Sequence, residues 1–297
     1  RRLFPGRDLV EVKAIDARAR GLRTSPFTLH VSDPAGRPVP AADVVVTRQG
    51  RSHAKTRTLT DGKADLELPE GGLYRLEVSS PGMGVRSVDA PEGGQGALHV
   101  ALDAGSRLIG KITGVDGLPI PAKVIINGVE GTETPDFGPE MGATEVKNLL
   151  YTSDGTFKRV LSAGRYEVIA AHGPEFDAVT RRVEIPPGGA EVPFTAQLKR
   201  TVDTKGWVSA DFHGHTTASG DTTASRHGRV LNLAAEGVEF APSTEHNRLD
   251  TYQDAIESLG LARFLKRCPG SELTSEPFGT NHPNAFPLIL HKHTQGG

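Results

Sequence analysis

Residues 108–126 read Leu-Ile-Gly-Lys-Ile-Thr-Gly-Val-Asp-Gly-Leu-Pro-Ile-Pro-Ala-Lys-Val-Ile-Ile, and this stretch decides the fold of the first two thirds of the chain. Its ends, Leu108–Ile112 and Val124–Ile126, are short apolar runs, and the Asp, Gly and Pro residues between them predict a turn. An earlier stretch has the same order, with strands expected at Phe27–Val31 and Val44–Val46 around a turn at residues 33–40. The chain is therefore predicted to use one strand–turn–strand unit twice.

Both copies continue with the same two signals. A Thr/Ser-Asp-Gly turn occurs at residues 60–62 and 153–155, and a segment with Gly and Tyr followed by alternating apolar residues occurs at 71–76 and 163–168. Short strands with turn signals at spacings of about 8–12 residues are typical of β-sandwiches. The sequence predicts all-β Ig-like sandwiches at residues 25–103 and 104–200, with residues 1–24 as an N-terminal arm or edge strand.

These repeated motifs resemble the carboxypeptidase regulatory-like family. Members of that family are Ig-like sandwiches that are usually appended to exported enzymes and receptors, so the resemblance implies a secreted protein in an extracellular, cell-surface or periplasmic location. Arg1–Pro5 do not begin an apolar signal segment, so we expect any export signal to lie outside this sequence. No apolar run approaches the roughly 18 residues of a membrane-spanning helix, so no transmembrane segment is expected.

The composition bears on the partners, the disulfides and the fold of the protein. The formal net charge of −2 does not favour nucleic acid or an anionic membrane surface. Cys268 is the single cysteine, which excludes an internal disulfide. The 35 glycines and 21 prolines favour short strands joined by many turns.

After Lys205 the pattern changes to strands that alternate with helices. Strands are expected at residues 207–210, 238–241, 264–267 and 284–290, and helices at 225–236 and 250–262. Ser225 and Asp250 are placed to cap the two helices, and Gly237 to end the first. This alternation predicts parallel βαβ units, whose functional residues lie at the carboxyl ends of the strands.

Two histidines follow the first of these strands. His213 and His215 are two residues apart, so on a strand they would project from the same face and form half of a transition-metal site. Further polar residues follow the expected strand ends: Asp221, Glu245, His246, Glu272 and His282. Imidazole and carboxylate ligands without a cysteine cluster suit Zn, Mn or Fe. For Glu245 we favour an indirect role, in which it orients a ligand histidine, over direct binding of the metal.

This order of motifs resembles the polymerase and histidinol phosphatase (PHP) superfamily, and most closely its CehA/McbA-like branch. The matching segments are His213–His215, Ser219–Asp221, Arg229–Phe240, Thr244–Asn247, Gly270–Glu272 and Asn281–Leu288. The resemblance implies that residues 205–297 are the N-terminal part of an α/β domain, a distorted β/α barrel. It implies two or three divalent metals (Zn, Mn or Fe), held by His213, His215, Asp221, His246, Glu272 and His282.

The implied activity is that of an exported metal-dependent hydrolase. A metal-bridged hydroxide would attack a phosphoester or a carboxyl or carbamate ester of a small molecule, and His215 or His246 would assist proton transfer. Compared with the family, Glu245 replaces an Asp, and only about four of the barrel's strands are present. The resemblance favours an enzyme, although its ligand set is incomplete in this chain.

A second function belongs to a different class. The tandem sandwiches would form a structural or adhesive surface or filament protein, with a degenerate or partner-completed hydrolase domain. Self-association would then use the sandwich edges or a missing C-terminal portion.

Overall fold

A computed structural model describes residues 5–91, 96–138, 145–274 and 282–290 of the protein. The chain divides into two compact units. The first comprises Arg1–Arg107 with the short segments Val160–Ala163 and Pro186–Ala190, and the second comprises the remaining residues, including all of the C-terminal segment. Within the described ranges, no helix is both long and apolar enough to span a lipid bilayer.

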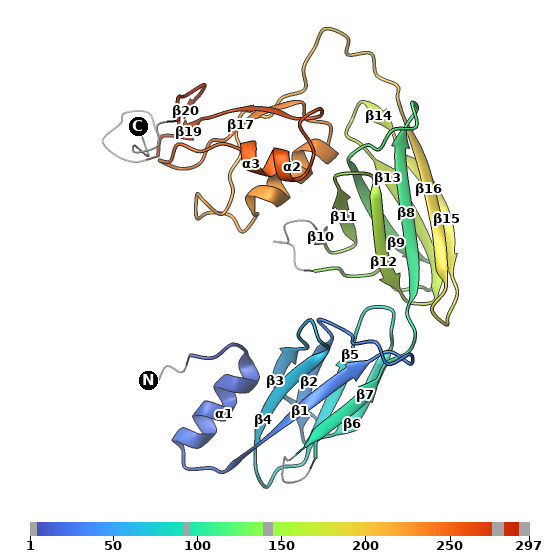
Figure 1. The fold of residues 1–297 in the computed structure, drawn as a ribbon, viewed down its shortest axis with the longest axis vertical. Coiled ribbons are helices and arrows are strands. Elements are labelled where there is room, and N and C mark those ends of the chain that lie inside the picture. The colour runs from blue at the N-terminus through green and yellow to red at the C-terminus, as the bar shows by residue number, and fades with distance from the viewer. Residues whose placement is uncertain (1–4, 92–95, 139–144, 275–281, 291–297) are drawn as a thin grey trace. The chain divides into compact units, whose positions relative to one another are not determined.

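The first unit contains a β-sandwich, as the sequence predicts (Figure 1). One sheet has the order β4-β1-β7 and the other the order β3-β2-β5-β6. The bounds are β1 (Thr24–Ser32), β2 (Asp43–Arg48), β3 (Arg51–Arg57), β4 (Lys63–Pro69), β5 (Tyr74–Ser79), β6 (Val85–Asp89) and β7 (Ala97–Ala101). Alternate residues of β1 and β2, among them Leu29, Val44 and Val46, are fully buried between the sheets. This period of two fixes which face of each strand enters the core.

The N-terminal segment differs from the prediction of an arm or edge strand. Residues Leu9–Ala19 form a helix, α1, which packs on β3 and β4. The Asp8 side chain caps it by accepting a hydrogen bond from the Glu11 N–H at 2.9 Å. Val10, Ala14 and Ala17 are buried at helical spacing. The helix forms because this narrow apolar stripe can pack against the sandwich.

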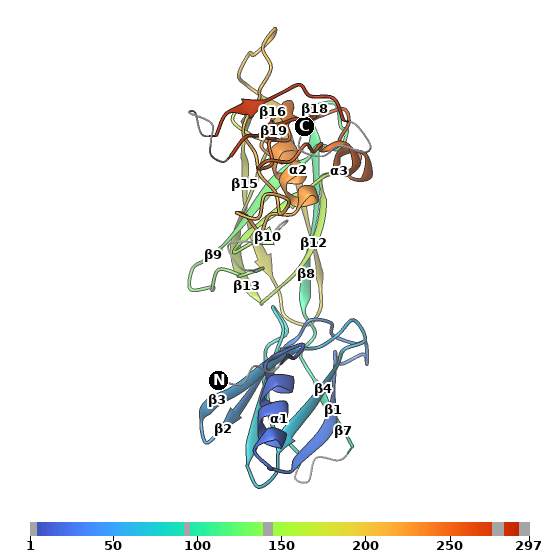
Figure 2. The same cartoon turned by 90° about the vertical axis from the view of Figure 1, so that its left-hand side faces the viewer.

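The second unit begins with another sandwich (Figure 2). Its sheets have the orders β10-β11-β9-β13-β15 and β12-β8-β16-β14. The bounds are β8 (Ser106–Gly114), β9 (Ala122–Val129), β10 (Glu145–Val146), β11 (Leu149–Thr152), β12 (Thr156–Leu161), β13 (Gly164–Ala171), β14 (Phe176–Asp177), β15 (Val179–Ile185) and β16 (Glu191–Arg200). Ile126, Val168 and Leu198 are each fully buried. The second predicted sandwich is therefore present.

The C-terminal segment contains short elements only. They are α2 (Arg226–Ala235), β17 (Phe240–Pro242), α3 (Gln253–Ser258), β18 (Lys266–Cys268), β19 (Ser271–Glu272) and β20 (Asn284–Ala285). Strands β17 and β18 are parallel, and Ala210 makes a parallel bridge to Phe240. Helix α2 begins as predicted, because the Ser225 hydroxyl accepts a hydrogen bond from the Gly228 N–H at 3.1 Å. The predicted alternation of strand and helix is therefore present, but the elements are only two to ten residues long.

Three expectations for this segment are wrong. Residues 207–210 are not a buried strand, since the side chains of Trp207 and Val208 are 81% and 67% exposed and only Ala210 pairs. Asp250 does not cap the second helix; its carboxylate forms an ion pair with Arg226. The described residues form two-stranded sheets here and not a β/α barrel. Short strands without further parallel neighbours do not close a barrel.

His172 joins the C-terminal segment to the second sandwich. It follows β13, is 6% exposed, and packs edge-to-face on Phe176 and Phe264, with ring centroids 4.7 Å and 6.2 Å away. Burial lowers the pKa of His172, and hydrogen bonding to the Pro121 and Ala235 backbone only partly opposes this. Folding therefore disfavours the protonated form of this imidazole.

The buried imidazole predicts a pH dependence of stability. The folded pKa of His172 lies below the unfolded value of about 6.5, so the unfolded chain binds more protons as the pH falls. The unfolding free energy should decrease below pH 6.5, by up to about 1.4 kcal/mol per pH unit from this residue. Chemical denaturation at pH 7.5 and 5.5 measures the effect. His172→Gln should reduce the slope and His227→Gln, on the exposed face of α2, should not; equal slopes in parent and H172Q proteins would refute the assignment.

Candidate metal centre

The structure brings the six predicted ligand residues together in one place. We call them the histidine–carboxylate cluster: His213, His215, Asp221, His246, Glu272 and His282. They form three overlapping sets, His213/His215/Glu272, His215/Asp221/His246 and His246/Glu272/His282. Within each set the candidate ligand atoms lie within 4.8 Å of one another. Residues up to 69 positions apart in the sequence therefore bring their candidate ligand atoms close enough to share bound ions.

Glu272 lies at the centre of the cluster. Its side chain is 1% exposed, and β19 holds it through pairing with β20 and a parallel bridge to His246. One carboxylate oxygen, Oε2, lies 3.1 Å from His213 Nε2 and 3.0 Å from His215 Nε2. The other, Oε1, lies 2.6 Å from His282 Nδ1. This one carboxylate thus contacts both sides of the cluster.

His213 and His215 lie in the loop that follows Ala210. Their Nε2 atoms are 2.8 Å apart. Gly214, between them, fixes the loop: its N–H donates to Thr244 Oγ1 at 2.9 Å, and its carbonyl accepts from the Tyr252 hydroxyl at 3.3 Å. The two rings converge because the backbone between them is tied down, and not because they share the face of a strand.

His246 and Asp221 complete the other side of the cluster. His246 stacks on His215 with ring centroids 4.5 Å apart, and its Nε2 lies 3.0 Å from Asp221 Oδ2. His246 Nδ1 lies 2.5 Å from Thr274 Oγ1. The side chain of Asp221 is 50% exposed and that of His282 51%, so the cluster is open to solvent on this side. A ligand from solution can therefore reach it.

Both carboxylates of the cluster favour the ionised form. Burial opposes ionisation of Glu272, but hydrogen bonds from His282 and His213 outweigh it and lower the pKa. Burial likewise opposes ionisation of Asp221, and the hydrogen bond from His246 outweighs it, so this pKa is also lowered. Two anionic carboxylates among imidazole nitrogens form an environment that attracts a cation.

The donor atoms suit a divalent transition metal. A metal with bonds of about 2.1 Å to imidazole or carboxylate holds neighbouring ligand atoms roughly 3.0–3.4 Å apart. The contacts around Glu272 Oε2, at 3.0 and 3.1 Å, have this spacing. Nitrogen and oxygen donors without thiolate fit Zn, Mn or Fe. The residues present therefore fit the predicted ions by the chemistry of their donor atoms, and the contacts around Glu272 Oε2 also fit by spacing.

Glu245 is not among the ligands. Its side chain is fully buried, and its carboxylate accepts hydrogen bonds from Thr216 and Ser219. The hydroxyl groups beside the cluster, Thr216, Ser219, Thr244, Thr274 and Tyr252, are the residues that sequence reasoning missed. The Thr and Ser residues on either side of the two histidine motifs were the available signal, but single hydroxyls do not identify their partners.

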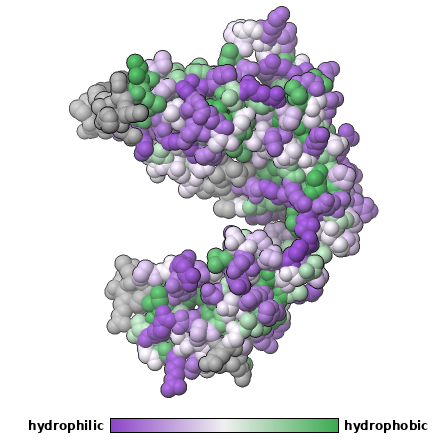
Figure 3. Space-filling view, viewed as in Figure 1, coloured by the Kyte–Doolittle hydropathy of each residue, from purple (hydrophilic) through white to green (hydrophobic). Residues whose placement is uncertain are grey.

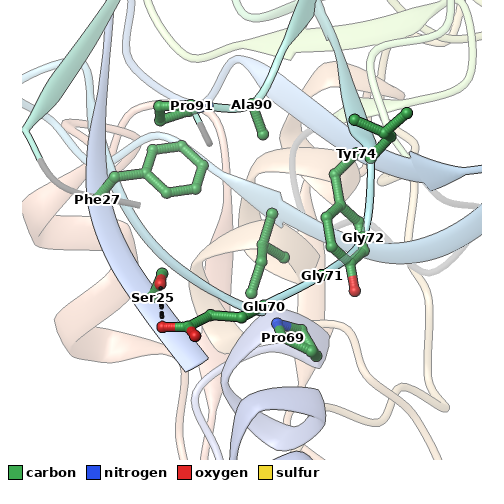
Figure 4. Close-up of a pocket in the computed structure, with 11 residues that line it drawn as sticks. Ser25, Phe27, Pro69, Glu70, Gly71, Gly72, Tyr74, Ala90 and Pro91 are labelled. Atoms are coloured by element: carbon green, nitrogen blue, oxygen red, sulfur yellow. Dashed lines mark hydrogen bonds between the residues drawn. The ribbon is translucent and has the colours of Figure 1, made fainter. Parts of the chain in front are cut away.

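A pocket in the first sandwich offers a contrast (Figure 4). It has a volume of about 470 Å³, with Phe27, Leu68 and Tyr74 among its walls. Its carboxylate, Glu70, accepts a hydrogen bond from Ser25 at 3.0 Å. Glu70 is the one carboxylate in the lining of this pocket, whereas the histidine–carboxylate cluster gathers several groups able to bind a metal.

Comparison with known families supports one of the two predicted resemblances. Residues 27–103 match the family model described as carboxypeptidase regulatory-like domain. The first sandwich is thus such a domain, as predicted. No curated protein matches the chain.

Several solved structures match the chain with low sequence identity. The Bacillus anthracis TIE protein has 18% identity and a TM-score of 0.26; the match covers 64% of this chain and 35% of that one, so the chain spans about a third of it. A mutant of the shaft pilin SpaA from Lactobacillus rhamnosus GG has 10% identity and a TM-score of 0.35, covering 61% and 100%. The minor pilin GBS52 of Streptococcus agalactiae has 14% identity and a TM-score of 0.29, covering 61% and 98%. Likeness at this level carries no function to this chain.

These findings correct the classification drawn from the second resemblance. The matched family model and the pilin structures give no support to the expected classification as a metal-binding hydrolase of the PHP superfamily. The family match covers only the first sandwich. A role for the histidine–carboxylate cluster therefore depends on its geometry alone.

Proposed function

We propose that the histidine–carboxylate cluster binds divalent metal ions of the Zn, Mn or Fe type. The single observation that supports this is the convergence of four imidazoles and two carboxylates, in three overlapping sets, around the buried Glu272. Such a group is costly to keep together without a cation, because carboxylates repel one another and buried charge needs compensation. A bound ion would compensate both carboxylates at once.

The three overlapping sets would provide up to three positions for metal ions. His213, His215 and Glu272 would hold a first ion, and Glu272, His246 and His282 a second. Asp221 with His215 and His246 offers a third position. A bound divalent metal supplies Lewis acidity and lowers the pKa of its water. The 50% exposure of the Asp221 side chain gives solutes access to that side.

Isothermal titration with Zn²⁺ after removal of metal by a chelator tests the proposal. Saturable binding with a dissociation constant in the micromolar range or below, at a stoichiometry of at least one ion per chain, is the expected result. A fragment that comprises residues 1–107 lacks the cluster and serves as the control. If the heats of the full chain are no larger than those of this fragment, the metal proposal is wrong.

A structural role on the cell surface is the second candidate function. The match at residues 27–103 supports it, because carboxypeptidase regulatory-like domains usually accompany exported proteins. Strand β6 supports it further: it is the last strand of its sheet, and Val85 on it is 63% exposed. An edge strand of this kind can pair with a second copy of the chain. Hydrophobic and hydrophilic residues are interspersed over the face of the protein in Figure 3.

Self-association by strand pairing has a direct test. Sedimentation velocity from about 5 to 200 μM should show a concentration-dependent increase in mass, as for a weak dimer. A monomer over the whole range would contradict this second function and leave the metal proposal untouched.

A further inference from the structure

The pocket in the first sandwich lies at one end of the two sheets (Figure 4). Its walls come from the start of β1, the end of β4, the turn at residues 70–73, the start of β5 and residues 90–91. Backbone hydrogen bonds hold these segments together, since the Glu70 N–H donates to the Arg23 carbonyl and the Ala90 N–H to the Tyr74 carbonyl, both at 2.9 Å. The volume of about 470 Å³ lies in the range of sites that bind small molecules.

Apolar side chains form the sides of this pocket. Phe27, Leu68 and Tyr74 are each 5% exposed and belong to the core of the sandwich, which fixes their positions. Figure 4 shows the Phe27 ring on one side of the pocket and the Tyr74 side chain on the other. Leu73 also lines the pocket and is 78% exposed, so part of the apolar lining faces solvent. A ligand with a hydrocarbon body would remove this surface from water.

Glu70 gives one end of the pocket a negative charge. Its Oε1 accepts a hydrogen bond from the hydroxyl of the buried Ser25 at 3.0 Å, and this bond holds the carboxylate at the pocket. Among the residues that the structure describes, none forms an ion pair with Glu70, so its second oxygen, Oε2, is available to a ligand. A carboxylate in this position favours a cationic partner that can donate hydrogen bonds.

Arg48 makes the other side of the pocket unfavourable for a cation. Its guanidinium carbon lies 5.5 Å from the centroid of the Tyr74 ring. A cation in the pocket would therefore be repelled near Tyr74 and attracted to Glu70. We infer that the pocket binds a small organic ammonium ion, with the ammonium group on Glu70 and the apolar body between Phe27 and Tyr74. This inference goes beyond metal binding and self-association and depends on neither.

Phenethylammonium and 2-phenylethanol test the inference, because they share an apolar body and differ in charge. Each is titrated into the full chain at pH 7 and followed by ¹H–¹⁵N NMR, with a chelator present so that the amine cannot bind through a metal ion. The amine should bind with a dissociation constant of about 1 mM or below. The largest shifts are expected at the amides of Gly71 and Gly72, which line the pocket. The alcohol should bind about fivefold more weakly, as the loss of a partly exposed ion pair predicts.

Glu70→Gln removes the charge and keeps the acceptor for Ser25. This variant should bind the amine about fivefold more weakly than the parent and no better than it binds the alcohol. Glu77→Gln is the matched control, because Glu77 is an exposed carboxylate on β5 of the same sandwich, outside the pocket, and its affinity should equal that of the parent. The inference is wrong if about 20 mM amine shifts none of the amides at residues 70–74. It is also wrong if the parent binds both compounds within twofold, or if the two variants lose equal affinity.

Discussion

Replacing Glu272 by alanine is expected to lower the affinity of the protein for Zn²⁺ by more than about 100-fold, beyond the loss typical for a supporting residue. The reason is the position of its carboxylate, which contacts His213, His215 and His282. Removing it takes a ligand from two of the three overlapping sets and one of the two negative charges. Isothermal titration of the parent and E272A proteins gives the ratio of the two dissociation constants.

The control for this experiment is Glu184→Ala. Glu184 is an exposed carboxylate on β15, so its removal changes the net charge by the same amount without touching the cluster. E184A should bind Zn²⁺ as the parent does. Equal losses in the two variants would mean that nonspecific charge attraction, and not coordination by Glu272, accounts for binding.

Replacing Gly155 by alanine is expected to destabilise the second unit by at least about 3 kcal/mol. Gly155 has φ +73°, a conformation that costs a residue with a Cβ atom. An added Cβ would also lie 2.1 Å from the carbonyl oxygen of Ile112 on β8. The Ile112 N–H donates to the Gly155 carbonyl at 2.8 Å, so neither strand can move away without losing this bond. Chemical denaturation followed by circular dichroism measures the loss.

Gly117→Ala separates the two causes. Gly117 has a similar φ of +77°, but an added Cβ would meet no atom within 4 Å. It should cost only the backbone strain, about 1–2 kcal/mol. If G155A is no more destabilising than G117A, the close approach of the turn to β8 is not important for stability.

The repeated turn also shows why the sandwiches could be predicted from the sequence. Gly62, the equivalent of Gly155, has φ +74° and the same close approach, with an added Cβ 2.6 Å from Val31 O. The Val31 N–H donates to the Gly62 carbonyl at 2.8 Å, as Ile112 does to Gly155. Glycine in a turn and alternating apolar residues are local signals with a strong steric cause. Two copies of them therefore identify two sandwiches.

The wrong predictions concern short segments whose structure depends on contacts with residues that are distant in the sequence. The apolar residues Trp207 and Val208 suggested a buried strand, but burial requires a neighbouring surface that their sequence does not specify. Helix α1 was missed because its buried stripe, Val10, Ala14 and Ala17, is mostly alanine and gives a weak pattern. In both cases tertiary packing, and not local preference, decided the structure.

The identity of the residues in the candidate site was predicted better than their arrangement. The six side chains of the histidine–carboxylate cluster were named from their positions after expected strand ends, and the structure brings them together. The reason expected for His213 and His215, a shared strand face, was wrong, because hydrogen bonds of Gly214 to Thr244 and Tyr252 hold that loop. The hydrogen bonds of Ser219 could not be predicted, since they join residues that are 26 and 27 positions apart in the sequence.

The most direct test of the account is the metal content of the purified full chain. Bound metal would be removed with a chelator, and the protein would then be supplied with Zn²⁺, Mn²⁺ or Fe²⁺ and dialysed. Inductively coupled plasma mass spectrometry would measure the metal that remains bound. We expect two or three ions per chain for at least one of these metals, as a cluster of shared ligands would hold, and less than one in E272A. A parent protein that retains no more metal than E272A would contradict the central claim that the histidine–carboxylate cluster is a metal centre.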